Sequence, residues 1–221
     1  MLAALCIAGW SACGGDSGPP ITPKSRFRDN GDGTVSDTRT GLRWEKKDQG
    51  GGLHDVDTGY LWAGFCDADI DLCQPDAASA STCSTATMGA RGCKQCPGPC
   101  DTSGRITIWQ WLNQLNASNF AGHNDWRIPT VAEDGGTTEL ESILLANYPY
   151  CETRPCVDSV FNNSCTSGCT LATCSCTATF CYWSATTPVA DTSFAWIIDF
   201  AFGLPRGGYP KDDLNLVRAV R

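Results

Sequence analysis

The chain has 221 residues, of which 42% are hydrophobic and 18% are charged. This composition indicates a globular protein with one large domain and excludes a disordered chain. The formal net charge of −8 makes nucleic acid, sulfated polysaccharide and anionic lipid poor partners, because they carry charge of the same sign.

The first element in chain order is an apolar run at residues 2–10, followed by two small residues and Cys13. The run is shorter than the roughly 20 apolar residues that a membrane span needs, so it indicates a signal peptide. A cysteine after Ser-Ala resembles a bacterial lipobox, in which the cysteine is diacylated. We therefore expect residues 1–13 to be a signal peptide, with Cys13 lipidated and the lipid as the membrane anchor. The alternatives are an ordinary signal cleaved after Ala12 and, since no positive region precedes the run, a start upstream of Met1.

Fifteen cysteines accompany this signal. In an exported chain such a density forms disulfides, whereas in the cytosol it would suggest metal clusters. We expect an exported protein of the cell envelope, anchored at the outer membrane or present at the cell surface. Without Cys6 and Cys13 the number of cysteines is odd, so one thiol is free or pairs between chains, or Cys13 is not lipidated. The candidates for disulfides are Cys66, Cys73, Cys83, Cys93, Cys96, Cys100, Cys151, Cys156, Cys165, Cys169, Cys174, Cys176 and Cys181.

Residues 14–25 are rich in Gly, Pro and Ser and predict a flexible linker, so the folded domain is expected over 26–221. The Asn-Gly and Asp-Gly pairs at 30–33 supply the positive φ angles of a tight turn and predict a hairpin over 27–35. Residues 48–104 lose periodicity and hold six cysteines, which predicts a long insertion held by disulfides.

Apolar residues recur at helical spacing at Ile108, Trp109, Leu112 and Leu115, which predicts a helix over 107–119 with Thr107 as its cap. A second short helix is expected at 138–145, and a second cysteine-rich block at 151–181. Large apolar residues occupy every second position from 194 to 200, which predicts a strand with one aromatic, buried face. That face is formed by Phe194, Trp196, Ile198 and Phe200. The expected strands lie at 182–184, 194–200 and 216–220.

Four separated motifs form a pattern in this order: Asp-Asn-Gly-Asp-Gly-Thr-Val at 29–35, Asp-Trp-Arg-Ile-Pro-Thr at 125–130, Tyr-Trp-Ser at 182–184 and Val-Arg-Ala-Val-Arg at 217–221. Together they resemble the Lcl C-terminal domain family over about residues 26–221, apart from the two cysteine-rich blocks. The resemblance implies an α+β fold of the C-type-lectin-like kind. Its terminal strands pair, two helices flank a small, mostly antiparallel sheet, and long disulfide-braced loops form the ligand face. The adhesin after which the family is named binds sulfated glycans, and the acidic charge here speaks against that ligand.

Candidate site residues fall into two groups. Exposed aromatic and charged residues on an expected loop at 203–213 are typical ligand groups. Those residues are Arg206, Tyr209, Lys211, Asp212 and Asp213. Alternating carboxylates in the first insertion could bind calcium, with a solvated acidic loop as the alternative, and no other cofactor is expected. Those carboxylates belong to Asp67, Asp69 and Asp71.

Two further patterns point to chemistry less strongly. The spacing of Cys93, Cys96 and Cys100 resembles a zinc site, but the compartment and the presence of only two histidines favour disulfides. The stretch 123–125 pairs a histidine with an aspartate without a nucleophile, so it is expected to belong to the scaffold. Arg127 is expected to form an ion pair with Glu139 or Glu141.

These features predict a non-catalytic binding or adhesion domain of the lectin-like type, tethered to the envelope. Its partner would be an unidentified glycan, or an envelope or extracellular protein. One alternative is a structural envelope lipoprotein without a specific ligand. Another is an enzyme of the formylglycine-generating fold group, whose Trp-Arg-Leu-Pro-Thr segment is similar to residues 126–130. Enzymes of that group use a reactive pair of cysteines, and the sequence shows no motif that matches such a pair.

Overall fold

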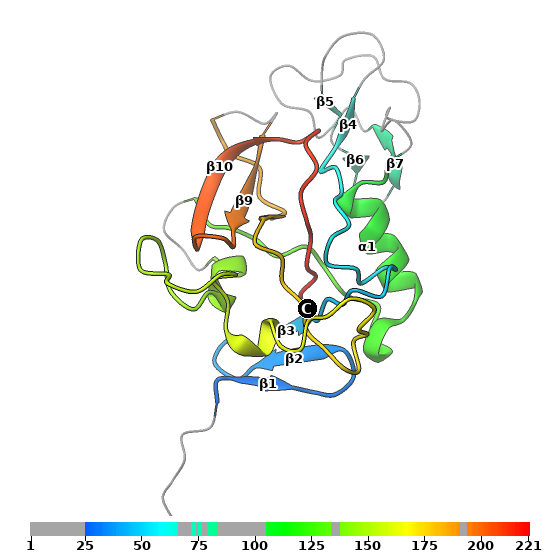
Figure 1. The fold of residues 1–221 in the computed structure, drawn as a ribbon. Helices are drawn as coiled ribbons and strands as arrows, with labels where there is room; N and C mark the ends of the chain where they lie inside the picture. The colour runs from blue at the N-terminus through cyan, green and yellow to red at the C-terminus, as the bar shows by residue number, and fades with distance from the viewer. Residues whose placement is uncertain are drawn as a thin grey trace, which may run out of the picture.

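A computed structural model describes residues 25–65, 72–73, 75–76, 79–83, 105–133, 138–190 and 194–221. This part of the chain contains two three-stranded antiparallel sheets, two pairs of short strands, one α-helix and several 3-10 turns, which is an α+β arrangement. Figure 1 shows the helix on one side of the molecule and the loop after residue 144 on the other. None of the described helices is long and apolar enough to cross a bilayer.

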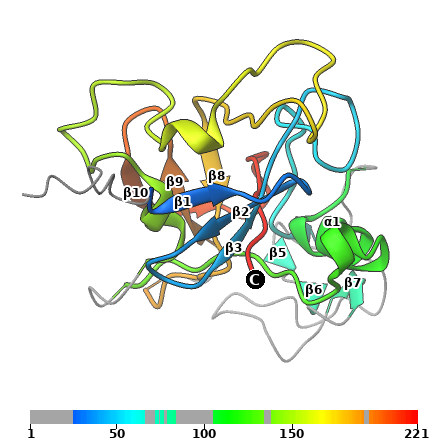
Figure 2. The same cartoon turned by 90° about the horizontal axis from the view of Figure 1, so that it is seen from below.

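The N-terminal sheet has the order β1-β2-β3, with β1 at Phe27–Asp29, β2 at Thr34–Asp37 and β3 at Arg43–Glu45. The turn between β1 and β2 uses Gly31 and Gly33 at φ 75° and 87°, a backbone region that favours glycine. The Asp29 carboxylate accepts a hydrogen bond from the Gly31 amide at 2.9 Å and closes the turn. The hairpin predicted over 27–35 is therefore confirmed. Figure 2 shows this sheet from below.

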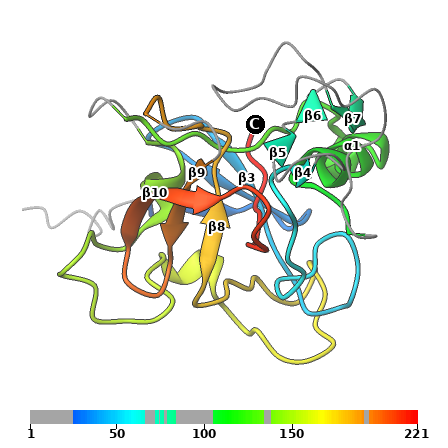
Figure 3. The same ribbon diagram turned by 90° about the horizontal axis from the view of Figure 1, so that it is seen from above.

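The C-terminal sheet has the order β10-β9-β8, with β8 at Cys181–Trp183, β9 at Phe194–Asp199 and β10 at Leu204–Pro210 (Figure 3). The expected loop at 203–213 is therefore mostly a strand, because residues 204–210 pair with β9. The pairing shifts register between Arg206 and Tyr209. A side chain at Gly207 would lie 2.9 Å from the ring of Trp196, so glycine is needed for this close approach.

The last residues join the two sheets without forming a named strand. The amide and carbonyl of Arg43 exchange hydrogen bonds with those of Arg221 at 2.9 and 3.0 Å. On the other side, the Leu216 amide donates to the Cys181 carbonyl at 3.0 Å, and the Trp183 amide donates to the Leu216 carbonyl at 2.8 Å. The N- and C-terminal segments thus pair, as expected, but 216–220 bridges the sheets instead of forming a strand.

Strand β9 divides the core into two apolar clusters. Successive side chains of a strand point to opposite faces, so Ala195 and Ile197 join one cluster while Ile198 joins the other. The predicted aromatic face is fully buried at Ile198 and Phe200 and partly buried at Phe194 and Trp196. The opposite face is buried as well, because β9 is the central strand and is covered on both sides. The first cluster contains four tryptophans, Trp62, Trp111, Trp126 and Trp183, and the second contains Trp44, Phe161 and Tyr182 among its large side chains.

Helix α1 spans Ile108–Ala117 and begins at the predicted cap. The Thr107 hydroxyl accepts from the Gln110 amide at 3.3 Å, and the Gln110 side chain accepts from the Thr107 amide at 2.8 Å. This capping box satisfies amides that the first turn would leave unpaired. Ile108, Trp111 and Leu115 are buried, so the core face includes Trp111 in place of the expected Trp109 and Leu112, which are only partly buried.

The remaining elements are short. Three are 3-10 turns: η2 at Phe120–Gly122, η3 at Leu140–Ile143 and η4 at Ser159–Phe161. The second predicted helix is therefore only the single turn η3. Four are strands in two pairs: β4 at Gly64–Phe65 with β5 at Leu72–Cys73, and β6 at Pro75–Asp76 with β7 at Ser79–Cys83.

Part of the predicted first insertion, 48–104, packs inside the domain. Residues 60–63 are buried, and Trp62 is fully enclosed in the first cluster, with its indole N–H donating to the Ser184 carbonyl at 2.8 Å. A segment this deeply packed belongs to the domain core, although its flanking residues lack periodicity. The second cysteine-rich block also contributes to the core, through Val157 and Phe161.

Candidate functional site

A pocket of about 430 Å³ opens where three segments meet. Hydrogen bonds between Tyr60 and Asn215, at 2.9 and 3.2 Å, hold the first segment to the third. The Leu216 amide reaches the Cys181 carbonyl and so holds the third segment to the second. The terminal segment therefore lies between the other two segments at the pocket. The lining residues are Asp57, Gly59, Ala178, Thr179, Phe180, Leu214 and Leu216.

The pocket combines apolar surface with a few polar groups. The side chain of Phe180 is 52% exposed, which leaves an aromatic ring open to solvent at the pocket. Asp57 and Thr179 are exposed beside it, and Asp57 accepts a hydrogen bond from the Gln49 side chain at 3.2 Å. An apolar concavity with few convergent polar groups is typical of ligand sites. Its only ionisable lining residue is acidic, so it suits an uncharged or cationic ligand better than an anion.

The five residues expected on the ligand face do not line this pocket. Lys211 is 1% exposed, lies 3.8 Å above the ring of Trp62 and donates to the Thr187 hydroxyl at 2.8 Å. Placing Lys211 on a ligand face was therefore wrong, because its stem and charge pack against the core. Arg206 is exposed and lies 3.6 Å from the Asp199 carboxylate.

Of the other three, Tyr209 is partly buried and contacts Cys181, with its hydroxyl 3.6 Å from the sulfur. Asp212 is partly buried, and burial raises the pKa of its carboxyl. Asp213 is exposed. Phe180 and Leu214 are the two exposed apolar residues of the pocket, and neither was predicted from the sequence. Both lie outside any periodic run, so no sequence pattern marks them.

Three disulfides brace the described loops: Cys151–Cys156, Cys165–Cys176 and Cys169–Cys174. The two cysteines flanking Ser175 pair with different partners, as their spacing predicts. The pairing predicted for Cys181 was wrong, because it is a free thiol buried in strand β8. Burial raises the pKa of the Cys181 thiol, so it is protonated at neutral pH and a poor nucleophile.

Several predicted site residues lie outside the described part of the chain. They include Cys13 and the carboxylates Asp67, Asp69 and Asp71. No disulfide of the first insertion is described, so its candidates stay predictions. These are Cys66, Cys73, Cys83, Cys93, Cys96 and Cys100.

A buried group of charges, not identified from the sequence, joins β3 to the terminal segment. The Glu45 carboxylate is fully buried, 3.0 Å from the Lys47 ammonium and 2.8 Å from His54 Nδ1. It also accepts from the Ala219 amide at 2.9 Å, while Arg218 donates to the Glu45 carbonyl at 2.9 Å. Burial acts to raise the pKa of Glu45, but Lys47 and His54 outweigh it and lower the pKa. The group is enclosed, so its role is structural.

The polar residues of the family motifs form ion pairs within the scaffold. Arg127 and Glu139 make two hydrogen bonds of 2.5 and 2.6 Å, which confirms the first of the two predicted partners. Asp125 binds the Arg221 guanidinium at 2.8 and 3.1 Å. The His123 ring nitrogen lies 3.0 Å from a guanidinium nitrogen of Arg43. The ring therefore contacts a hydrogen-bond donor and not a nucleophilic side chain.

The chain matches the family model of the Lcl C-terminal domain over residues 33–221. No curated protein and no solved structure matched the chain. The matched range covers most of the chain and includes β2, β3, the C-terminal sheet, the helix and the terminal segment, while β1 lies just before it. The chain therefore belongs to the Lcl C-terminal domain family.

Proposed function

We propose that this chain is a non-catalytic binding domain with a C-type-lectin-like fold, tethered to the bacterial envelope, and that the pocket at Phe180 binds an uncharged glycan. The observation that carries the proposal is an exposed aromatic ring beside a carboxylate and a hydroxyl in one concavity. An aromatic face packs against the apolar face of a sugar ring, while the polar groups bind its hydroxyls.

The charge of the chain narrows the ligand class. A net charge of −8 repels sulfated and phosphorylated polymers, and Asp57 places a carboxylate at the pocket itself. The lectin-like fold is supported by the pairing of the terminal segments and by the braced loops around a small sheet.

The envelope location rests on the apolar run before Cys13 and on the linker after it. Intact mass of the chain purified from membranes of a bacterial host tests this part. We expect a mass that shows a diacylated Cys13 as the N-terminus, and we expect Cys13→Ser to release the protein from the membrane fraction. A signal cleaved after Ala12 without lipid would contradict the lipid anchor and leave the export proposal standing.

Binding is tested with the unlipidated Cys13→Ser chain on an array of neutral glycans, sulfated glycans and purified envelope polymers. We expect binding to neutral glycans, and we expect Phe180→Ala to weaken it by roughly tenfold, equivalent to about 1.4 kcal/mol. The matched control is Tyr150→Ala, which removes an aromatic ring that is 78% exposed but does not line the pocket.

Three results would overturn this assignment. Preferential binding to sulfated glycans would show that the binding site is not this pocket, because the carboxylate of Asp57 repels sulfate. Equal losses in Phe180→Ala and Tyr150→Ala would show that the pocket has no special role. No binding to any member of the array would favour a structural envelope protein.

A further inference from the structure

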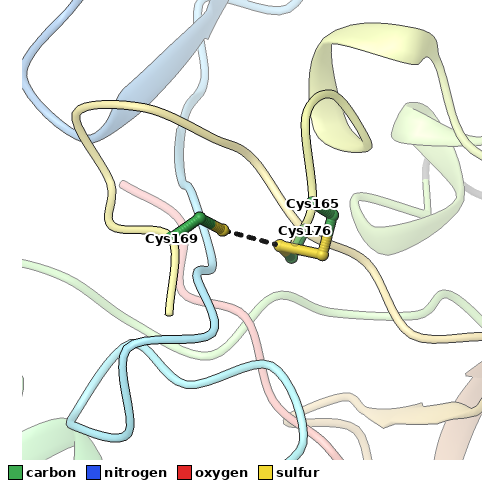
Figure 4. A group of neighbouring side chains, drawn as sticks. All are labelled: Cys165, Cys169 and Cys176. Atoms are coloured by element: carbon green, nitrogen blue, oxygen red, sulfur yellow. Dashed lines mark hydrogen bonds between the residues drawn. A yellow bond between two sulfur atoms is a disulfide. The ribbon is translucent and has the colours of Figure 1, made fainter. Parts of the chain in front are cut away.

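Four cysteine sulfurs meet in the loop 165–176. Its two disulfides, Cys165–Cys176 and Cys169–Cys174, lie against each other. The Cys176 sulfur is 3.7 Å from that of Cys169 and 3.9 Å from that of Cys174. Figure 4 shows the contact between Cys169 and the Cys165–Cys176 disulfide. The sulfurs of Cys165, Cys169 and Cys176 all lie within 4.8 Å of one another.

These spacings match those of a tetrahedral thiolate site. Zinc binds four thiolates at about 2.3 Å, which places neighbouring sulfurs about 3.8 Å apart. The two contacts between the disulfides already have this separation. Only the two bonded pairs would have to open, and rotation of the cysteine side chains supplies that movement without displacing the backbone far.

We propose that Cys165, Cys169, Cys174 and Cys176 form a zinc site in the reduced protein, so that the loop has a disulfide state and a metal state. A dithiol reductant supplies each disulfide with two electrons and two protons and itself becomes a disulfide. A phosphine supplies two electrons and becomes the phosphine oxide, with the oxygen and the two protons coming from water. Reduction of both disulfides yields four thiols. One Zn²⁺ then displaces the four thiol protons and is held by four thiolates. Thiolates are soft ligands, and zinc favours them in a tetrahedral arrangement.

The frame of the loop does not depend on the disulfides alone. The Cys176 amide donates to the Lys47 carbonyl at 2.8 Å, and the Gln49 amide donates to the Cys169 carbonyl at 3.2 Å. Asn163 and Ser175 exchange two backbone hydrogen bonds of 2.7 and 2.9 Å across the base of the loop. These bonds keep the four cysteines near one another after reduction.

The surroundings also suit a zinc tetrathiolate, which carries a net charge of −2. Arg218 is buried beside the loop and donates to the Cys176 carbonyl at 2.6 Å. Its guanidinium compensates part of that negative charge. Cys165 is exposed, which gives a reductant and the metal a route to three otherwise buried sulfurs. Within the described residues, no other group of three metal-ligating side chains gathers in this way.

The test is alkylation of the full chain after reduction with tris(2-carboxyethyl)phosphine in the absence of oxygen. The reduced protein is treated briefly with iodoacetamide, with and without one equivalent of Zn²⁺, and labelled cysteines are mapped by mass spectrometry of peptides. We expect zinc to abolish labelling at all four loop cysteines. Cys151 and Cys156, which form the other described disulfide, are the internal control and should label equally in both samples.

A second measurement uses Co²⁺, which absorbs visible light strongly when four thiolates hold it in a tetrahedron. The double variant Cys169→Ser with Cys174→Ser should lose this band, and Cys151→Ser with Cys156→Ser should keep it. If zinc protects none of the four cysteines, or protects Cys151 and Cys156 equally, the proposal is wrong. Retention of the band in both variants would place the metal on other cysteines and overturn it as well. The alkylation result decides even where a variant fails to fold.

Discussion

The two-sided core around β9 and the loop at 145–156 are stabilised by different means. In the core, Ile197 and Ile198 are fully buried on opposite faces of one strand. In the loop, Tyr148 and Tyr150 are 57% and 78% exposed, and a disulfide between Cys151 and Cys156 closes the turn. Burial of apolar surface stabilises the core, whereas the crosslink limits the unfolded forms of the loop. The scaffold and the surface loops of one chain are thus stabilised by separate means.

The largest expected effect comes from removing a core side chain. Trp183 is fully buried, and its indole N–H donates to the Tyr60 carbonyl at 2.8 Å. Trp183→Ala should lower the free energy of unfolding by roughly 3–5 kcal/mol, because it leaves a cavity and an unpaired carbonyl. Urea unfolding followed by fluorescence measures this. Tyr150→Ala in the loop is the control and should change stability by less than about 0.5 kcal/mol. Similar losses in the two variants would contradict the division between core and loop.

A smaller effect is expected from breaking the loop crosslink. The double variant Cys151→Ser with Cys156→Ser should cost about 2 kcal/mol, because this disulfide closes a short loop. Hydrogen exchange should rise in residues 145–156 and stay unchanged in β9. Equal increases in both regions would show that loop and core unfold together, and the two means of stabilisation would then not be separate.

The smallest effect is expected from acid. Burial acts to raise the pKa of Glu139, but the Arg127 guanidinium outweighs it and lowers the pKa from its usual value of 4.5. A carboxyl with a lower pKa in the folded state stabilises the protein above its unfolded pKa, and this stabilisation is lost as the pH falls through the folded value. The free energy of unfolding should therefore decrease below about pH 4.5.

Glu139→Gln should make that decrease shallower, and the exposed Glu152→Gln should leave it unchanged. Urea unfolding at several pH values provides the comparison. The pair is partly exposed, so solvent screening keeps the difference small. If the free energy of unfolding depends on pH in the same way in Glu139→Gln and in the unaltered chain, the ion pair does not contribute to the acid sensitivity of the scaffold.

The pocket and the pairing of cysteines were decided by tertiary contacts. Phe180 and Leu214 become neighbours only because the terminal segment folds back beside β8. Cys181 resembles the other cysteines of its block in sequence, yet it lies in strand β8, is buried in the core and forms no disulfide. Lys211 has the composition of a surface residue, but packing against Trp62 buries it. None of these outcomes follows from local spacing, because each depends on which distant segment arrives next to the residue.

The first hairpin, the start of the helix and the family could be predicted from the sequence alone. The glycines at 31 and 33 specify the hairpin, because only their backbone tolerates its positive φ angles. Thr107 and Gln110 specify the start of the helix, because their side chains satisfy its first amides. The burial of both faces of β9 and the meeting of three segments at a pocket arise from tertiary contacts and could not be predicted from local sequence. Burial and pocket shape depend on contacts between residues far apart in the chain, and periodicity records only neighbours.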